Sequence, residues 1–467
     1  MRERLWQWSR RTALCSCLCL AAGLSHGQST SGTVSAGMER EFQAAMAAED
    51  SGDLDRAESL LLGLRAKYPG IFAVDESLGL LYVARKNIAQ ALPLLEAAAR
   101  EEPASDVAHA NLGAAYFRLH RNQEALRELQ RAAQLNPKNA ETQQALGRLW
   151  MEAHKPARAA EAFAAALELK PGDSDLLLAR AQALEEAGKT SQAKDLVSSL
   201  PGVDQSAAAQ SLLGDIEEKS GAYREAAQHY SRAVEIDPSE ANTWMLGVEF
   251  LRHWTFDAAI REFKAAAAKF PQRTRMRLGL GVAYFGNGNY AKSVPVFADL
   301  LDADAGNALY AELLGMACTK LTQEDKPRCG ALVSYAESHP GNAKASTYAA
   351  AMLVHEGVTD EEMHLARKLL QTAITADPKL SEARYQMGML QQIQGDWAGS
   401  VPNLQGAVVL RPNFANAHYR LGLAYSHTGD KQTAQSELAL YKKYYEVHED
   451  DLDRRLHQIT KLLVDVH

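Results

Sequence analysis

Helical runs of apolar and polar residues end at regularly spaced prolines along most of the chain. Four successive ones, Pro69, Pro103, Pro137 and Pro171, share one constant spacing of about 34 residues. The register continues through Pro238, Pro271, Ala305, Pro340, Pro378 and Pro412. Because proline cannot donate an interior helical hydrogen bond but suits a first turn, each marks where one helix stops and the next begins. The pattern predicts a chain of repeated helical units.

Small residues follow the same spacing. A glycine recurs at a nearly fixed distance before the proline position, at Gly79, Gly113, Gly147, Gly214, Gly247, Gly281, Gly315, Gly388 and Gly422. An alanine recurs midway between that glycine and the proline position, at Ala57, Ala91, Ala125, Ala159, Ala193, Ala226, Ala259 and Ala366, with Ala434 in the last unit. A glycine inside a helix costs about 1 kcal/mol relative to alanine. Close helix contact offsets that cost, and we expect the alanine to face the glycine across a helix pair.

The order Leu-Gly-x-x-Tyr, Ala, Phe or Leu, Ala and Pro resembles the tetratricopeptide repeat, a helix-turn-helix unit of about 34 residues. Tyr82, Tyr116, Tyr284 and Tyr425 each follow their glycine by one helical turn. The resemblance implies an all-α fold, a right-handed α-α superhelical solenoid of about twelve repeats over residues 38–446. The expected units end near residues 69, 103, 137, 171, 205, 238, 271, 305, 340, 378, 412 and 446. Neighbouring units must stack, because each leaves an apolar face open.

Residues 1–27 have the pattern of a secretory signal peptide, with a basic start and an apolar stretch from Thr12 to Leu24. That stretch is shorter than the roughly 20 residues that cross a membrane. Residues 28–37 are expected to form a flexible linker. The segment Ser9–Leu14 resembles a twin-arginine export signal, Cys15 leaves a lipoprotein signal open, and a cytosolic protein with an accidental apolar start is the remaining alternative.

The segment at the end of the chain, 447–467, is predicted to form an amphipathic helix. Leu452, Leu456, Ile459 and Leu463 recur at helical spacing on one face, and the other face is strongly charged. A solenoid needs such a polar outer face at its open end, so this segment is expected to cap the array.

Composition narrows the function classes. Aromatic residues are only 7% and alanine is over-used, which favours close-packed helices over sheets. The net charge is −8 and no basic stripe is visible, so nucleic-acid binding is not expected. No later segment has an apolar run of the length that a membrane span needs, so no span is expected in the mature chain.

Of five cysteines, three lie in the signal segment and two, Cys318 and Cys329, lie in the repeats. Cys318 stands at the tyrosine position of a first helix and Cys329 near the alanine position of the second. The resemblance implies that these positions face each other, and export implies an oxidising compartment. We therefore predict a disulfide, with two buried free thiols as the alternative.

No constellation for catalysis or cofactor binding is evident. His448 has acidic neighbours but no second histidine one helical turn on, and Cys318 and Cys329 lack partners for zinc. The glycine-rich segment 279–288 follows no strand and has no phosphate-binding lysine. We expect no enzyme activity, no cofactor and no metal, although a hydrolase hidden in the repeats is not excluded.

In tetratricopeptide proteins the first helix of each unit lines an inner groove that commonly binds peptides or proteins. The inner positions of this resemblance predict a groove lined by Phe117, Arg118, Arg148, Trp244, Arg252, Phe285, His355, Tyr385 and Tyr419. Exposed Trp, Tyr and Arg dominate interface energetics, whereas an aromatic on a helix is often core. The inner positions also differ in charge along the chain. Arg118 and Arg148 lie in the third and fourth units, and acidic residues follow in the fifth and sixth, at Glu185, Glu186, Asp215 and Glu218.

Some family members hold a peptide's C-terminal carboxylates in a clamp of lysine, asparagine and arginine. Asn111 occupies one such position, but Glu76 and Glu141 stand where lysines would be needed, so the clamp is not expected. The leading hypothesis is an exported, non-catalytic scaffold, periplasmic or secreted, that binds a protein or peptide partner. The alternative is an accessory subunit of envelope polysaccharide synthesis or export.

Overall fold

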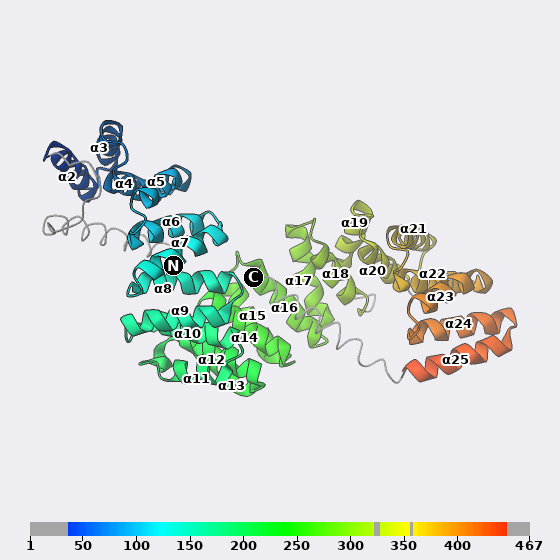
Figure 1. Cartoon of the computed structure of the whole chain (residues 1–467). Helices are drawn as coiled ribbons and strands as arrows, with labels where there is room; N and C mark the ends of the chain where they lie inside the picture. The colour runs from blue at the N-terminus through cyan, green and yellow to red at the C-terminus, as the bar shows by residue number, and fades with distance from the viewer. Residues whose placement is uncertain (1–35, 322–326, 355–357, 446–467) are drawn as a thin grey trace. The chain divides into compact units, whose positions relative to one another are not determined.

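The computed structural model describes residues 36–321, 327–354 and 358–445, and over these it contains 24 α-helices and no strand (Figure 1). The helices alternate between a first and a second helix of each repeat. The first helices are α2 (Ala36–Asp50), α4 (Phe72–Ala84), α6 (Asp106–Arg118), α8 (Ala140–Glu152), α10 (Ser174–Glu186), α12 (Ala207–Ser220), α14 (Glu240–Arg252), α16 (Thr274–Gly286), α18 (Ala308–Cys318), α20 (Ala343–Leu353), α22 (Ser381–Ile393) and α24 (Ala415–Thr428). The all-α repeat fold is confirmed.

The second helices are α3 (Leu54–Lys67), α5 (Ile88–Glu101), α7 (Asn122–Leu135), α9 (Pro156–Leu169), α11 (Thr190–Ser198), α13 (Tyr223–Ile236), α15 (Phe256–Lys269), α17 (Tyr290–Ala303), α19 (Gly330–Ser338), α21 (Asp360–Ala376), α23 (Trp397–Leu410) and α25 (Lys431–Tyr445). Two short 3₁₀ segments, η1 (Val203–Gln205) and η3 (Pro327–Cys329), lie in connections. The predicted signal peptide and the predicted capping helix lie outside the described residues.

The described helices form two compact units, which the sequence did not predict. The first unit ends at Ser220, after α12, and the second begins at Gly221, before α13. The division therefore falls inside the predicted sixth repeat. Within each unit, consecutive helices stack side by side, and each first helix packs against the second helix that follows it (Figure 1).

Helix boundaries follow from side-chain caps and from a recurring left-handed turn. The hydroxyl of Ser105 and the carboxylate of Asp173 each accept a hydrogen bond from a backbone N–H in the first turn of the following helix, which starts α6 and α10. The turn after several first helices needs a positive φ. Glycine fills it at Gly188, whereas His154 adopts φ 53° there. A non-glycine residue in that region is strained by about 1–2 kcal/mol.

Several repeated glycines of the first helices make close contacts within their own helix pair. A Cβ added to Gly147 would stand 2.6 Å from the Phe163 ring, and one added to Gly113 would stand 2.7 Å from Leu129 Cγ. In both pairs the large side chain belongs to the second helix of the same repeat. We expected the repeated alanine of that helix to be the partner, but a ring or branched side chain fills most of the space.

Cys318 and Cys329 are joined in a disulfide in the structure, with 6.0 Å between their Cα atoms. Cys318 ends α18 and Cys329 closes η3, just before α19 begins at Gly330. Both residues are fully buried. The bond therefore links the first helix of the ninth repeat to the segment that leads into its second helix.

Two histidines have the same structural role in different repeats. His109 Nδ1 lies 2.6 Å from a carboxylate oxygen of Glu128, and its Nε2 lies 3.2 Å from the Pro103 carbonyl oxygen. His418 makes equivalent contacts with Glu437 and the Pro412 carbonyl. These side chains bind the turn between repeats to the following helix pair.

Candidate partner-binding surface

The structure buries two of the predicted groove aromatics, so their assignment to an accessible groove is wrong. The Trp244 side chain is 2% exposed and Phe285 is 3% exposed. Trp244 packs against Phe263, with ring centroids 5.6 Å apart, and the Arg275 guanidinium covers its ring at 5.3 Å. Phe285 packs edge-on against Tyr290 at 5.3 Å. Large side chains on adjacent helices close over both rings.

Three other predicted aromatics keep part of their surface. Phe117 on α6 is partly buried against the core of the first unit. Tyr385 on α22 is partly buried and packs on Phe414, with centroids 4.8 Å apart, and burial raises the pKa of its hydroxyl. Tyr419 on α24 is 40% exposed and lies 5.1 Å from the Tyr441 ring. These rings remain available for contact with a partner.

The predicted arginines differ in their surroundings. Arg118, the last residue of α6, and Arg148, on α8, are both half-buried, and burial lowers the pKa of each guanidinium. Neither forms an ion pair or hydrogen bond with a described residue, although the charge of Asp175 acts on Arg148 at longer range. Arg252 lies 4.0 Å from the Glu249 carboxylate in its own helix. His355 lies outside the described residues, so its role stays a prediction.

One of the acidic residues predicted at inner positions already has a basic partner inside the first unit. Glu185 is buried and forms an ion pair with Lys219. Glu186 is exposed, and its carboxylate accepts a hydrogen bond from the Gln182 amide at 3.3 Å. The carboxylate of Glu185 is therefore a structural charge, and Glu186 is the more accessible of the two.

The side chain of Asn111 is engaged in a hydrogen bond inside the protein. Its side-chain amide donates to a carboxylate oxygen of Glu76 at 2.9 Å. Glu76 is only 6% exposed, and burial raises its pKa to about 7, while the hydrogen bond from Asn111 opposes that shift and the charge of Glu102 adds to it. The contact joins α4 to α6.

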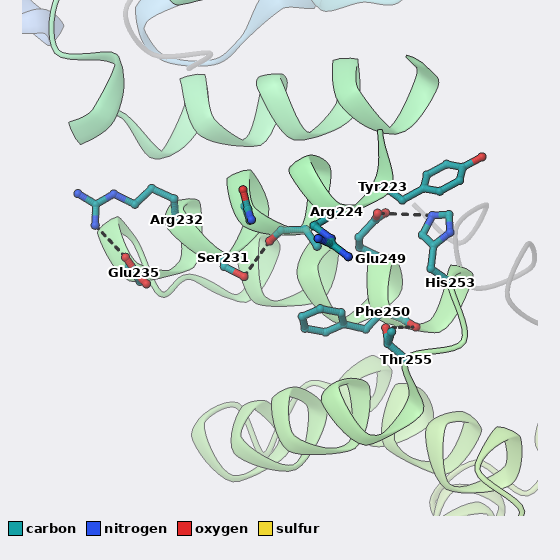
Figure 2. Close-up of a pocket in the computed structure, with 11 residues that line it drawn as sticks. Tyr223, Arg224, Ser231, Arg232, Glu235, Glu249, Phe250, His253 and Thr255 are labelled. Carbon is teal, nitrogen blue, oxygen red and sulfur yellow. Dashed lines mark hydrogen bonds and ion pairs between the residues drawn. The ribbon is translucent and has the colours of Figure 1, made fainter. Parts of the chain in front are cut away.

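A separate groove of about 650 Å³ lies in the second unit along α13 and the end of α14. Figure 2 shows its lining side chains. They are Tyr223, Arg224, Ala227, Gln228, Ser231, Arg232, Glu235, Glu249, Phe250, His253 and Thr255. The α13 members recur at helical spacing, so one helix face forms a wall of the groove.

The ends of this groove differ chemically (Figure 2). At one end the His253 ring stacks on Tyr223, with centroids 3.9 Å apart, and its Nε2 lies 3.5 Å from the Glu249 carboxylate. At the other end Arg232 forms an ion pair with Glu235 at 2.8 Å. A row of polar side chains between the two ends suits hydrogen bonding to an extended segment.

Models of a known protein family match most of the repeat region. Models described as tetratricopeptide repeat match residues 82–149 and 150–216, residues 42–106, 245–308 and 385–446, and residues 207–240. The chain belongs to the tetratricopeptide repeat family. No match covers residues 309–384, the segment that contains the disulfide.

Several solved structures are similar to this tetratricopeptide chain at low identity. The crystal structure of YrrB, described as a tetratricopeptide protein with an unusual peptide-binding site, is 16% identical, covers 39% of this chain and 94% of its own, and has a TM-score of 0.36. The pilF protein of Pseudomonas aeruginosa is 20% identical, with 44% and 94% coverage and a TM-score of 0.36. The Cut9–Hcn1 complex is 13% identical, with 91% and 96% coverage and a TM-score of 0.36. The comparison with curated proteins gives no match.

The repeat pattern did not predict the α13 groove, because it specifies only the core positions of this segment of the tetratricopeptide array. Ala226, Tyr230 and Ala233 are indeed buried as the repeat requires. The repeat does not fix five polar residues of α13 that line the groove, which are Arg224, Gln228, Ser231, Arg232 and Glu235. None of the predicted groove residues that the structure describes lies in it. A polar stripe between fixed core positions was the available signal.

Proposed function

We propose that this protein is a non-catalytic interaction scaffold of the cell envelope that binds a protein or peptide along its first helices. Tetratricopeptide repeats are interaction modules, and models of this repeat match most of the described residues. The supporting observation is a set of large side chains that the helix packing does not bury fully, namely Phe117, Arg118, Arg148, Tyr385 and Tyr419. Residues of these types contribute most to interface energetics.

The envelope location rests on the signal-like residues 1–27. Among the described residues, no helix combines the length and hydrophobicity that crossing a membrane requires. Mass spectrometry of the N-terminal peptide of protein from the native host should give Gln28 as the first residue. An unprocessed Met1 in the cytosolic fraction would contradict the envelope location.

Affinity purification from envelope extract tests the binding surface. The variant carries Phe117→Ala and Tyr419→Ala together, and should lose partners that the wild-type chain recovers after crosslinking. Its matched control carries Leu62→Ala and Val409→Ala, which are exposed apolar residues of second helices in the same two units. Equal partner recovery by both variants would contradict a first-helix binding surface.

Loss of an exported polymer on gene deletion, with no protein partner recovered, would favour the polysaccharide alternative.

A further inference from the structure

The aromatic end of the α13 groove has a ring face that the fold leaves uncovered. Tyr223 is 48% exposed, although the His253 ring lies against it with centroids 3.9 Å apart and planes inclined by 27°. One face of the tyrosine ring is therefore covered, and its exposed area lies on the opposite face and the edge. The stack also holds the ring in place, which lowers the entropy that a bound ligand would remove.

Trp254 adds a second exposed ring beside this end of the groove. It stands between His253 and Thr255, which both line the groove, and it is 43% exposed. Its φ of 59° is left-handed, in a turn that uses glycine at Gly188 and Gly288. This conformation is strained for a bulky residue, and an exposed side chain offsets little of the strain by burial. Strain that packing does not explain points to a function at this position.

Between its two ends the groove supplies hydrogen-bonding groups in balanced charge (Figure 2). Arg224, Gln228, Arg232 and Glu235 recur at helical spacing on one face of α13, which is about 18 Å long from Tyr223 to Glu235. Apart from the histidine at the aromatic end, the lining has two arginines and two glutamates, and Arg232 is paired with Glu235. A charged ligand therefore meets no excess of opposite charge, whereas a neutral ligand rich in donors and acceptors finds partners for both.

We propose that the α13 groove binds a neutral oligosaccharide. A sugar ring presents C–H groups on one face, which pack on the negative face of an aromatic ring. Its hydroxyl groups both donate and accept, so neighbouring hydroxyls match the paired groups of guanidinium, amide and carboxylate side chains. The site lies along a second helix, so it is additional to the first-helix surface of the proposed function.

A peptide is the less suitable occupant of this groove. Peptide and protein partners gain most of their affinity from side chains buried in apolar pockets. Besides Tyr223, the apolar part of the lining consists of Ala227 and the half-buried Phe250. These side chains give flat contact area beneath a polar wall, which suits a chain of sugar rings along the helix.

The test measures binding of the full-length chain to hexasaccharides labelled with a fluorophore at the reducing end. The neutral probes are cellohexaose, maltohexaose and chitohexaose, which differ in linkage and N-acetylation, and hexagalacturonate is the acidic comparison. Fluorescence anisotropy should show that at least one neutral probe binds, and more tightly than the acidic one. Binding by none of the neutral probes, or tighter binding of the acidic probe, overturns the inference.

Substitutions at the two exposed rings locate the site. Tyr223→Ala and Trp254→Gly should each weaken binding of the neutral probe roughly tenfold. Trp254→Gly should unfold at no lower urea concentration than the wild-type chain, because glycine adopts the left-handed turn without strain. Its matched control is His154→Gly, which changes an equivalent left-handed turn in the first unit and should leave sugar binding unchanged. Tyr445→Ala removes a similarly exposed tyrosine from α25 and should also bind like the wild-type chain.

The polar wall has its own variant, and the protein partner separates this inference from the proposed function. Arg224→Ala/Gln228→Ala should weaken binding of the neutral probe while the variant recovers the same crosslinked protein partners as the wild-type chain. Unchanged sugar affinity in this variant and in Tyr223→Ala would place the sugar elsewhere and overturn the inference. Loss of protein partners by these variants, with no sugar bound by the wild-type chain, would assign the groove to a peptide instead.

Discussion

At the scale of single residues, the repeat glycine of a first helix such as α8 is a packing requirement. Gly147→Ala would bring the new Cβ to 2.6 Å from the Phe163 ring, which is itself 2% exposed and enclosed. Because the ring cannot move freely, we expect a loss of roughly 1–3 kcal/mol in the free energy of unfolding. Urea unfolding followed by circular dichroism measures this loss.

Gly63→Ala is the matched control. Gly63 also lies within a helix, α3, but a Cβ there would meet nothing within 4 Å. This substitution should stabilise the chain by about 0.4–1 kcal/mol, because alanine loses less backbone entropy on folding. If both substitutions changed stability equally, contact with the facing side chain would not explain the glycine.

Glu76 makes stability depend on pH. Its pKa is raised to about 7 by burial, whereas the unfolded chain has an ordinary value near 4.5. The unfolded state therefore loses its proton first as pH rises, and the folded state becomes less stable between about pH 4.5 and 7. A difference of this size corresponds to ~3 kcal/mol.

Glu76→Gln should remove that part of the pH dependence. The variant should be more stable than the wild-type chain at pH 8 and close to it at pH 4.5, as measured by urea unfolding at both values. Glu161→Gln, which removes an exposed carboxylate from α9, provides the control. A parallel change in wild-type chain and Glu76→Gln across this range would show that another group carries the dependence.

At the scale of helices, the sequence predicted which segments form helices better than which side chains remain accessible. The regular proline spacing located the helix pairs because proline, glycine and alanine each mark one backbone requirement. Exposure depends instead on the neighbours of a position. Trp244 and Tyr419 both stand one helical turn before the repeat glycine, yet one is 2% and the other 40% exposed. Phe263 and Arg275 cover the tryptophan, and no single-repeat pattern encodes that contact.

In the ninth repeat, a disulfide contributes to stability in addition to helix packing. We expect the Cys318–Cys329 disulfide to stabilise the chain by about 2–3 kcal/mol, because it closes a short loop of sequence separation 11 in the unfolded state. Cys318→Ala/Cys329→Ala should therefore unfold at lower urea concentration, and reductant should affect only the wild-type chain. Mass measurement after alkylation of protein from the native host should find no free thiol in residues 28–467; two alkylated cysteines would contradict the bond.

At the scale of the whole molecule, stability in a repeat array passes between neighbours. Each described helix pair packs mainly against the pairs next to it within its unit. In such arrays the free energy is close to a sum of repeat and nearest-neighbour terms, so a local defect weakens nearby repeats most. The fourth repeat, formed by α8 and α9, belongs to the first unit, whereas the last repeats, α22–α25, belong to the second unit.

Hydrogen exchange of Gly147→Ala tests this locality. Amide exchange should accelerate in α8 and α9, and less strongly in the adjoining helices α6, α7 and α10, because these share the weakened contacts. Exchange in α22–α25 of the second unit should match the wild-type chain. Gly63→Ala should accelerate exchange in neither region. Equal acceleration throughout both units would mean that the array opens as one cooperative body, and the effect of a substitution on partner binding could then not be assigned to the repeat that carries it.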